Sequence, residues 1–133
     1  MKKTVLVTAA ALGLIAIVLG AFGAHGLKEL ISPEAQKTFE TGVRYQMYHA
    51  ILLLFVGNSA LFSEKTMKIL YYLVVVGVLF FSGSIYGLAT NSLTSFNFKT
   101  IGFITPVGGL FFILAWGILI VKFLKLTPKT DIK

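Results

Sequence analysis

The sequence TVLVTAAALGLIAIVLGAFGAHGL, residues 4–27, contains 24 residues without a formal charge between Lys3 and Lys28. A helix needs about 20 mostly apolar residues to cross the hydrocarbon core of a bilayer, which is roughly 30 Å thick. The stretch is therefore long enough to form a transmembrane helix. It indicates a membrane protein before any motif is considered.

The rest of the chain repeats this pattern. Further uncharged stretches of 19, 30 and 22 residues follow Arg44, Lys68 and Lys99. Each is close to or above the length of a membrane span. We therefore predict an all-α membrane protein, an antiparallel bundle of four transmembrane helices in a single domain over residues 1–133. The predicted spans are residues 4–24, 45–62, 69–90 and 100–121.

The composition agrees with this class. The chain is 56% hydrophobic and 13% charged, with a mean hydropathy of +0.87, whereas about a quarter of the residues in a soluble domain are charged. Because there is no cysteine, disulfides and thiolate sites are excluded. The net charge of +7 is typical of lysines that flank spans and contact anionic lipid headgroups. No run of basic residues suggests a nucleic-acid partner.

The first span has a second interpretation. Lys2 and Lys3, the apolar run and Ala21-Phe22-Gly23 together resemble a secretory signal peptide with a cleavage site. However, the run is longer than the roughly 7–15 apolar residues of a signal peptide. We therefore expect this helix to be retained as a span.

Orientation follows from the positive-inside rule, which places the loops richer in Lys and Arg in the cytoplasm. The first segment, the connection after the second span and the tail hold eight: Lys2, Lys3, Lys65, Lys68, Lys122, Lys125, Lys129 and Lys133. The other two connections hold four: Lys28, Lys37, Arg44 and Lys99. We therefore expect both termini to be cytoplasmic.

A short amphipathic helix is predicted on the outer surface before the second span. Ser32-Pro33 is a helix start, with a serine N-cap and a proline at the first helical position. Glu40 and Arg44 are four residues apart and are expected to form an ion pair. Apolar residues recur on one face at Ala35, Phe39 and Val43. This helix is expected to run or kink into the second span.

Small residues favour close helix packing, because lipid gives helices no hydrophobic reason to associate. One face of the first span carries Ala9, Gly13, Ala16, Gly20 and Ala24. The third and fourth spans carry Gly77, Gly83, Gly87, Gly102 and Gly109. Packing between helices is the main interpretation of these residues. Pro106 is expected to cause a kink or an opened turn in the fourth span, because it cannot donate a hydrogen bond to the carbonyl of Gly102.

The predicted spans hold no charged residue at mid-membrane depth, which argues against ion-coupled transport. Their polar groups gather in the outer half, and we expect a ligand-binding cluster there. Its candidate residues are His25, Arg44, Tyr45, Tyr48, His49, Ser82, Ser84, Tyr86 and Thr105. Because His25, His49, Tyr86 and Thr105 share one depth, we expect these four to meet.

Three interpretations of this cluster stay open: a structural hydrogen-bond network, a site for a lipid headgroup, quinone or other amphiphile, and a metal or bis-histidine haem site. Neither histidine has a carboxylate beside it in the span or a metal-ligand spacing, so we expect no metal and no cofactor. A hydrolase would need a group to orient the histidine beside Ser82 or Ser84. Since Glu40 is the only candidate for that role, we expect no enzyme.

Four motifs carry a resemblance to a known family. They are GAFGAHGL at 20–27, RYQMYHA at 44–50, FSGSIY at 81–86 and ITPVGG at 104–109. In this order, and over nearly the whole chain, they resemble the bacterial domain-of-unknown-function family 423, which is grouped with the mitochondrial transmembrane protein 256. The resemblance implies a small multi-span protein of the bacterial inner membrane, and it implies no activity.

Two functional hypotheses follow. The first is a non-enzymatic integral membrane protein that binds a lipid-like ligand, a second copy of itself or a larger membrane complex through the outer polar cluster and the glycine faces. The second is a small oligomeric transporter or channel. A channel needs a polar path through the whole bilayer, and the inner half of the predicted spans is almost entirely apolar.

Overall fold

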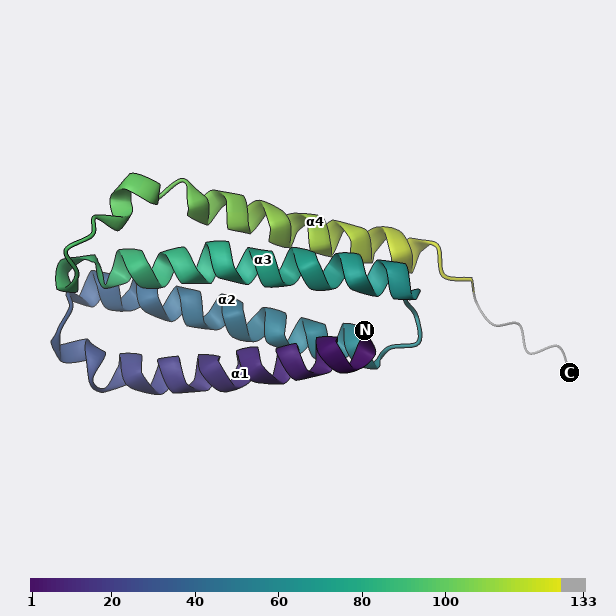
Figure 1. The fold of residues 1–133 in the computed structure, drawn as a ribbon, viewed down its shortest axis with the longest axis horizontal. Coiled ribbons are helices and arrows are strands. Elements are labelled where there is room, and N and C mark those ends of the chain that lie inside the picture. The colour runs from purple at the N-terminus through teal and green to yellow at the C-terminus, as the bar shows by residue number, and fades with distance from the viewer. Residues whose placement is uncertain (128–133) are drawn as a thin grey trace, which may run out of the picture.

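The computed structural model describes residues 1–127. Four long helices run antiparallel to one another in chain order (Figure 1). They are α1 (Lys2–Ala24), α2 (Pro33–Asn58), α3 (Glu64–Ala89) and α4 (Ile104–Leu124). The connections contain short 3₁₀ turns, η1 (Leu27–Glu29), η2 (Asn91–Leu93) and η3 (Phe98–Ile101). The predicted all-α four-helix bundle is confirmed, while Lys129 and Lys133, which entered the orientation argument, lie outside the described residues.

Serine caps fix where α2 and α3 begin. The Oγ of Ser32 accepts a hydrogen bond from the backbone N–H of Ala35 at 3.1 Å, with Pro33 as the first helical residue. Ser63 caps α3 in the same way, through the N–H of Thr66 at 3.2 Å. The helix start at Ser32-Pro33 is therefore confirmed.

The helix ends differ from the predicted spans for physical reasons. The outer amphipathic segment and the second span form one unbroken helix, and residues 59–62, predicted to lie in the span, follow its end at Asn58. Helix α3 begins at Glu64 rather than at residue 69, because Ser63 caps a polar first turn that precedes the apolar stretch. Charge gaps mark the edge of the apolar layer, whereas the caps mark the ends of helices.

The chain opens directly before Pro106, where residues 102–103 form a turn between η3 and α4, in agreement with the predicted kink or opened turn. Helix α4 begins at Ile104, so Pro106 lies in the first turn rather than inside a span that begins at residue 100. Backbone N–H groups in the first turn of a helix have no partner within the helix. The missing N–H of proline is therefore harmless there, and the first turn of α4 needs no distortion.

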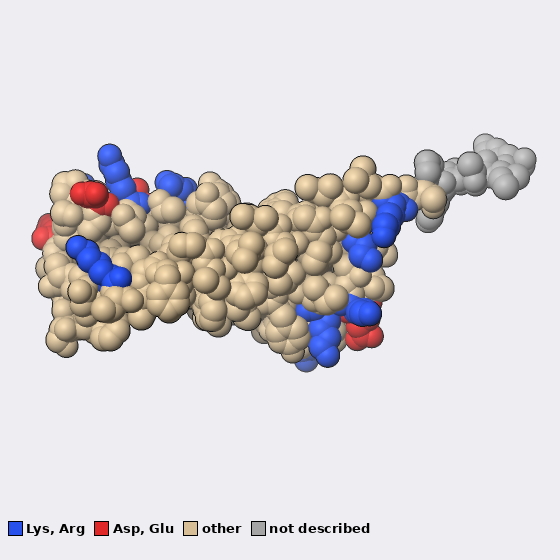
Figure 2. Space-filling view, turned by 90° about the horizontal axis from the view of Figure 1, so that it is seen from above, with Lys and Arg blue, Asp and Glu red and all other residues tan. Residues whose placement is uncertain are grey.

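Three segments are long and apolar enough to cross a membrane: α1, α3, and Phe98–Leu124, which is α4 with the turn before it. Helix α2 has 26 residues, which is about 39 Å at 1.5 Å per residue. Its polar side chains Gln46 and His49 are only 3% exposed each, so they face other helices. In Figure 2 charged residues gather at both ends of the molecule, with an uncharged belt between them.

The two ends differ in charge. One, here called the lysine-rich end, carries Glu64 and the lysines Lys2, Lys3, Lys65, Lys68, Lys122 and Lys125. The other, the mixed-charge end, carries Lys28, Glu29, Glu34, Lys37, Glu40, Arg44 and Lys99. Both charge signs are present at the mixed-charge end, whereas positive charge dominates the other (Figure 2).

Helix α1 packs along α2 through its small residues. Ala9 and Ala16 are 1% exposed, and a Cβ atom at Gly20 would lie 3.4 Å from Val43. Its apolar side chain Val5 is fully buried in the main core. This packing favours a retained helix over a removable signal peptide. Ala24, the last residue of the predicted face, is exposed.

The glycines of α3 and α4 divide into close contacts and open positions. Gly77 faces the ring of Phe112, and Gly87 faces the ring of Phe98. Gly109 is only in ordinary contact with Phe81, and a Cβ atom added at Gly83 would have no neighbour within 4 Å. Gly83 is thus not part of the packing within this chain. Gly102 lies in the turn before α4.

Candidate functional site

One buried glutamine links three helices in the half of the bundle near the mixed-charge end. Gln46 on α2 donates from Nε2 to the carbonyl of Leu12 on α1 at 2.9 Å. Its Oε1 accepts a hydrogen bond from the Tyr86 hydroxyl on α3 at 2.7 Å. Gln46 was not among the predicted site residues, although it stands in the RYQMYHA motif.

His49 is held by protein partners on every side. Its Nε2 accepts a hydrogen bond from the indole N–H of Trp116 at 3.2 Å, and its Nδ1 lies 2.7 Å from the carbonyl of Tyr45. The ring also stacks on Phe112, with centroids 3.6 Å apart. Because an indole N–H only donates, Nε2 must be the acceptor, and the proton sits on Nδ1. Neither nitrogen is left for a ligand.

Ser82 is fully buried, with an exposed fraction of 0%. Its hydroxyl donates to the carbonyl of Gly42 on α2 at 2.7 Å. A Cβ atom at Gly42 would lie 2.8 Å from the ring of Tyr86, so the glycine allows α2 and α3 to approach. The hydroxyl therefore stabilises the interface of these helices and does not face a substrate space.

Ser84 and Thr105 connect α3 to the first turn of α4 through a hydrogen bond between their hydroxyls. Ser84 also donates to the backbone of its own helix, at the carbonyls of Phe80 and Phe81. Thr105 therefore pairs with a serine and not with a histidine or Tyr86.

The predicted meeting of His25, His49, Tyr86 and Thr105 does not occur as one cluster. The last three enter three separate contacts, and His25, at the end of α1, is exposed and takes part in none of the side-chain hydrogen bonds within residues 1–127. Shared depth alone does not bring residues together, because each successive residue on a helix turns by about 100°.

The other predicted site residues lie at the surface. Arg44 donates to the hydroxyl of Thr41 at 3.2 Å, and no ion pair with Glu40 forms in the part of the chain that the structure describes. Tyr45 and Tyr48 are 38% and 53% exposed, and their rings contact each other with centroids 5.7 Å apart. Exposed tyrosines at this depth are typical of the aromatic belt at a membrane interface.

The half of the bundle near the lysine-rich end has one polar link that the sequence reasoning missed. The hydroxyls of Thr8 on α1 and Tyr71 on α3 lie 3.0 Å apart. A threonine and a tyrosine among apolar residues gave little signal, because either can lie unpaired at the surface. The bond joins two helices that are not neighbours in sequence.

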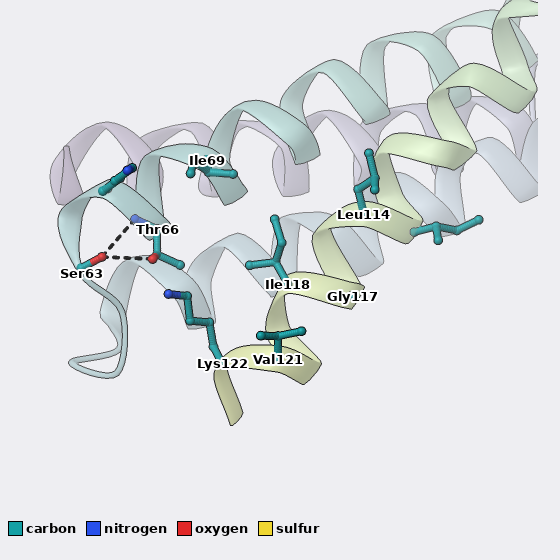
Figure 3. A pocket seen from close by; sticks show the side chains of 10 residues that line it. Ser63, Thr66, Ile69, Leu114, Gly117, Ile118, Val121 and Lys122 are labelled. Atoms are coloured by element: carbon teal, nitrogen blue, oxygen red, sulfur yellow. Dashed lines mark hydrogen bonds between the residues drawn. The ribbon is translucent and has the colours of Figure 1, made fainter. Parts of the chain in front are cut away.

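A groove opens between the first turns of α3 and the last turns of α4, at the lysine-rich end (Figure 3). Its volume is about 710 Å³, within the range of roughly 300–1,000 Å³ found for small-molecule sites. Apolar side chains form most of its wall: Ile69, Ile113, Leu114, Ile118 and Val121. We call this feature the α3/α4 groove. Its remaining lining residues are Ser63, Lys65, Thr66, Gly117 and Lys122.

Glycines decide the shape of this helix pair. At Gly108 the backbone of α4 touches the backbone of α3, because a Cβ there would lie 2.8 Å from the Cα of Phe81. At Gly117, further along α4, no atom lies within 4 Å of such a Cβ. The two helices are therefore in backbone contact near Gly108, and the groove lies further along the pair, near Gly117, where they are apart.

The polar rim of the groove consists of two lysines and a capping pair. The hydroxyl of Ser63 donates to that of Thr66 at 3.0 Å and accepts from the N–H of Thr66, so both are engaged in the α3 cap. Lys65 and Lys122 are exposed. Among the described residues no group of three or more His, Asp or Glu side chains is placed to hold a metal ion.

Comparison with known proteins adds a family. Residues 19–109 match the family model described as "Protein of unknown function (DUF423)". Similar relatives include a UPF0382 membrane protein of Haemophilus influenzae, 38% identical over 87% of this chain and 90% of its own length. The UPF0382 inner membrane protein YgdD of Escherichia coli is 33% identical, over 96% of this chain and 95% of its own. No solved structure matches the chain.

Proposed function

The chain belongs to the DUF423 family of small bacterial membrane proteins, and from that premise we propose that it is a non-enzymatic membrane protein that binds a membrane lipid in the α3/α4 groove. The observation that carries the proposal is the groove itself, an apolar cavity of about 710 Å³ with two lysines at its charged end. An amphiphile has the same division into an apolar body and a polar head.

The groove is a better candidate than the polar residues near the mixed-charge end. Both nitrogens of His49 have protein partners, and the amide of Gln46 bonds to two neighbouring helices. Buried polar groups that are already paired gain nothing from a ligand. These residues support a structural network that stabilises the bundle.

A transporter or channel formed by one chain has less support. A conduit needs polar groups or water along the whole bilayer. The core toward the lysine-rich end is instead filled by fully buried apolar side chains, among them Val5, Leu53, Leu70 and Val74. Any passage would have to form between copies of the chain.

Filling the groove should remove the lipid. We expect Gly117→Leu to lose most of the lipid that co-purifies in a mild detergent, as counted by native mass spectrometry. Gly117 lines the groove, and no protein atom lies within 4 Å of a Cβ added there. Gly83→Leu is the matched control. A Cβ atom added at Gly83 also has no neighbour within 4 Å, but Gly83 does not line the groove. Equal lipid retention by the two variants would contradict the proposal.

We further propose that the lysine-rich end faces the cytoplasm, because Lys-rich segments stay on that side. The chain has no cysteine, so single cysteines report orientation cleanly. In intact cells or spheroplasts, Lys37→Cys should react with a membrane-impermeant maleimide, and Lys68→Cys should react only after the membrane is opened. The reverse labelling pattern would overturn this orientation.

A further inference from the structure

We propose that the α3/α4 groove selects an anionic phospholipid, with Lys65 and Lys122 binding its phosphate and the apolar wall holding an acyl chain. This inference rests on the proposed lipid-binding function and adds the chemical class of the headgroup.

The two lysines come from opposite walls of the groove. Lys65 stands in the first turn of α3 and Lys122 near the end of α4. In Figure 3 the side chain of Lys122 extends from α4 toward Ser63 and Thr66 at the start of α3. Both lysines thus line the groove at its charged end, beside the place that the headgroup of a lipid lying along the apolar wall would take.

The charge around the groove favours an anion. The acidic residue described at this end, Glu64, does not line the groove. It lines a neighbouring cavity with Met1, Lys65 and Lys68, so Lys65 stands at the boundary of the two. Figure 2 shows mostly basic residues at this end, whereas acidic and basic residues alternate at the mixed-charge end. Because six lysines outnumber Glu64 at this end, the local net charge is positive and attracts phosphate.

The same pair discriminates between lipid classes. Phosphatidylglycerol carries one net negative charge, whereas the headgroup of phosphatidylcholine carries its own cation beside the phosphate. Both lipids fit the apolar wall formed by residues such as Ile69 and Ile118. Only the zwitterionic headgroup brings a positive charge close to Lys65 and Lys122, and the repulsion of that charge offsets the attraction of its phosphate. Selectivity should therefore come from the lysines, and acyl-chain binding from the wall.

The test titrates the full-length protein in detergent with phosphatidylglycerol or with phosphatidylcholine of the same acyl chains. Binding is read by native mass spectrometry and by the lipid-induced rise in Tm. The double variant Lys65→Gln/Lys122→Gln should bind phosphatidylglycerol roughly 25-fold more weakly, which corresponds to about 2 kcal/mol, or 1 kcal/mol for each lysine near an anionic lipid. Its binding of phosphatidylcholine should not change.

The control is Lys68→Gln/Lys125→Gln, which removes the same charge from the same end at residues that do not line the groove. We expect it to bind phosphatidylglycerol like wild type. If both double variants lose binding equally, the effect is general surface charge and the inference is overturned. If wild type binds the two lipids equally, headgroup selectivity is overturned while lipid binding in the groove stands. If Gly117→Leu binds both lipids as wild type does, the groove itself is not the site.

Discussion

Gly108→Ala should lower the free energy of unfolding by about 3 kcal/mol, the upper part of the range for overpacked positions. A Cβ atom at this position would lie 2.8 Å from the carbonyl carbon of Phe80 and from the Cα of Phe81, and closer still to the backbone nitrogen of Phe81. These are backbone atoms of α3, and they have no rotamer through which to move aside. The two helices must therefore separate, which also weakens the bond between Ser84 and Thr105.

The control for this prediction is Gly117→Ala, the same change on the same helix at a position with no atom within 4 Å. We expect it to be neutral or slightly stabilising, because alanine is a better helix former than glycine by about 1 kcal/mol. Reversible unfolding in mixed micelles, or Tm in detergent, measures the difference. If the Gly108→Ala and Gly117→Ala proteins have the same stability, α3 and α4 do not meet at this backbone contact.

Gln46→Leu should lower the free energy of unfolding by about 2 kcal/mol, the cost of leaving a buried polar group without its partner. The substitution removes the acceptor of the Tyr86 hydroxyl and the donor to the carbonyl of Leu12. Inside a bilayer no water is at hand to replace a missing partner. The tyrosine hydroxyl is therefore left unpaired among apolar side chains.

A double-mutant cycle separates this effect from lost packing. Adding Tyr86→Phe to Gln46→Leu removes the unpaired hydroxyl, so the double variant should be more stable than the sum of the two single effects predicts. The exposed Tyr48→Phe controls for the loss of a tyrosine hydroxyl and should change stability little. Strict additivity of Gln46→Leu and Tyr86→Phe would mean that the two side chains do not interact in the bilayer.

The polar network explains why RYQMYHA and FSGSIY stand out in an otherwise apolar sequence. Gln46 and His49 lie on the buried face of α2, and Ser82 and Tyr86 lie on the facing side of α3. Their partners are other helices of the same chain. The motifs therefore account for how the bundle holds together.

The sequence by itself determined the class of protein, the number of helices and some helix starts. Long gaps between charges report where the chain meets the apolar layer, since charged side chains are costly in hydrocarbon. The start of α2 follows from the Ser32 cap and Pro33, which act within a few residues. These properties are local, and a single chain segment contains all the information that they need.

Only the tertiary structure decided which polar residues meet and where helices touch. Depth in the bilayer follows from sequence position, but the direction of a side chain depends on the rotation of its helix, which packing against other helices sets. His49 thus reaches Trp116 on α4 and not the exposed His25. For the same reason Gly108 meets the backbone of α3, whereas the predicted Gly109 is only in ordinary contact with the ring of Phe81. A step of one residue turns a side chain by about 100°.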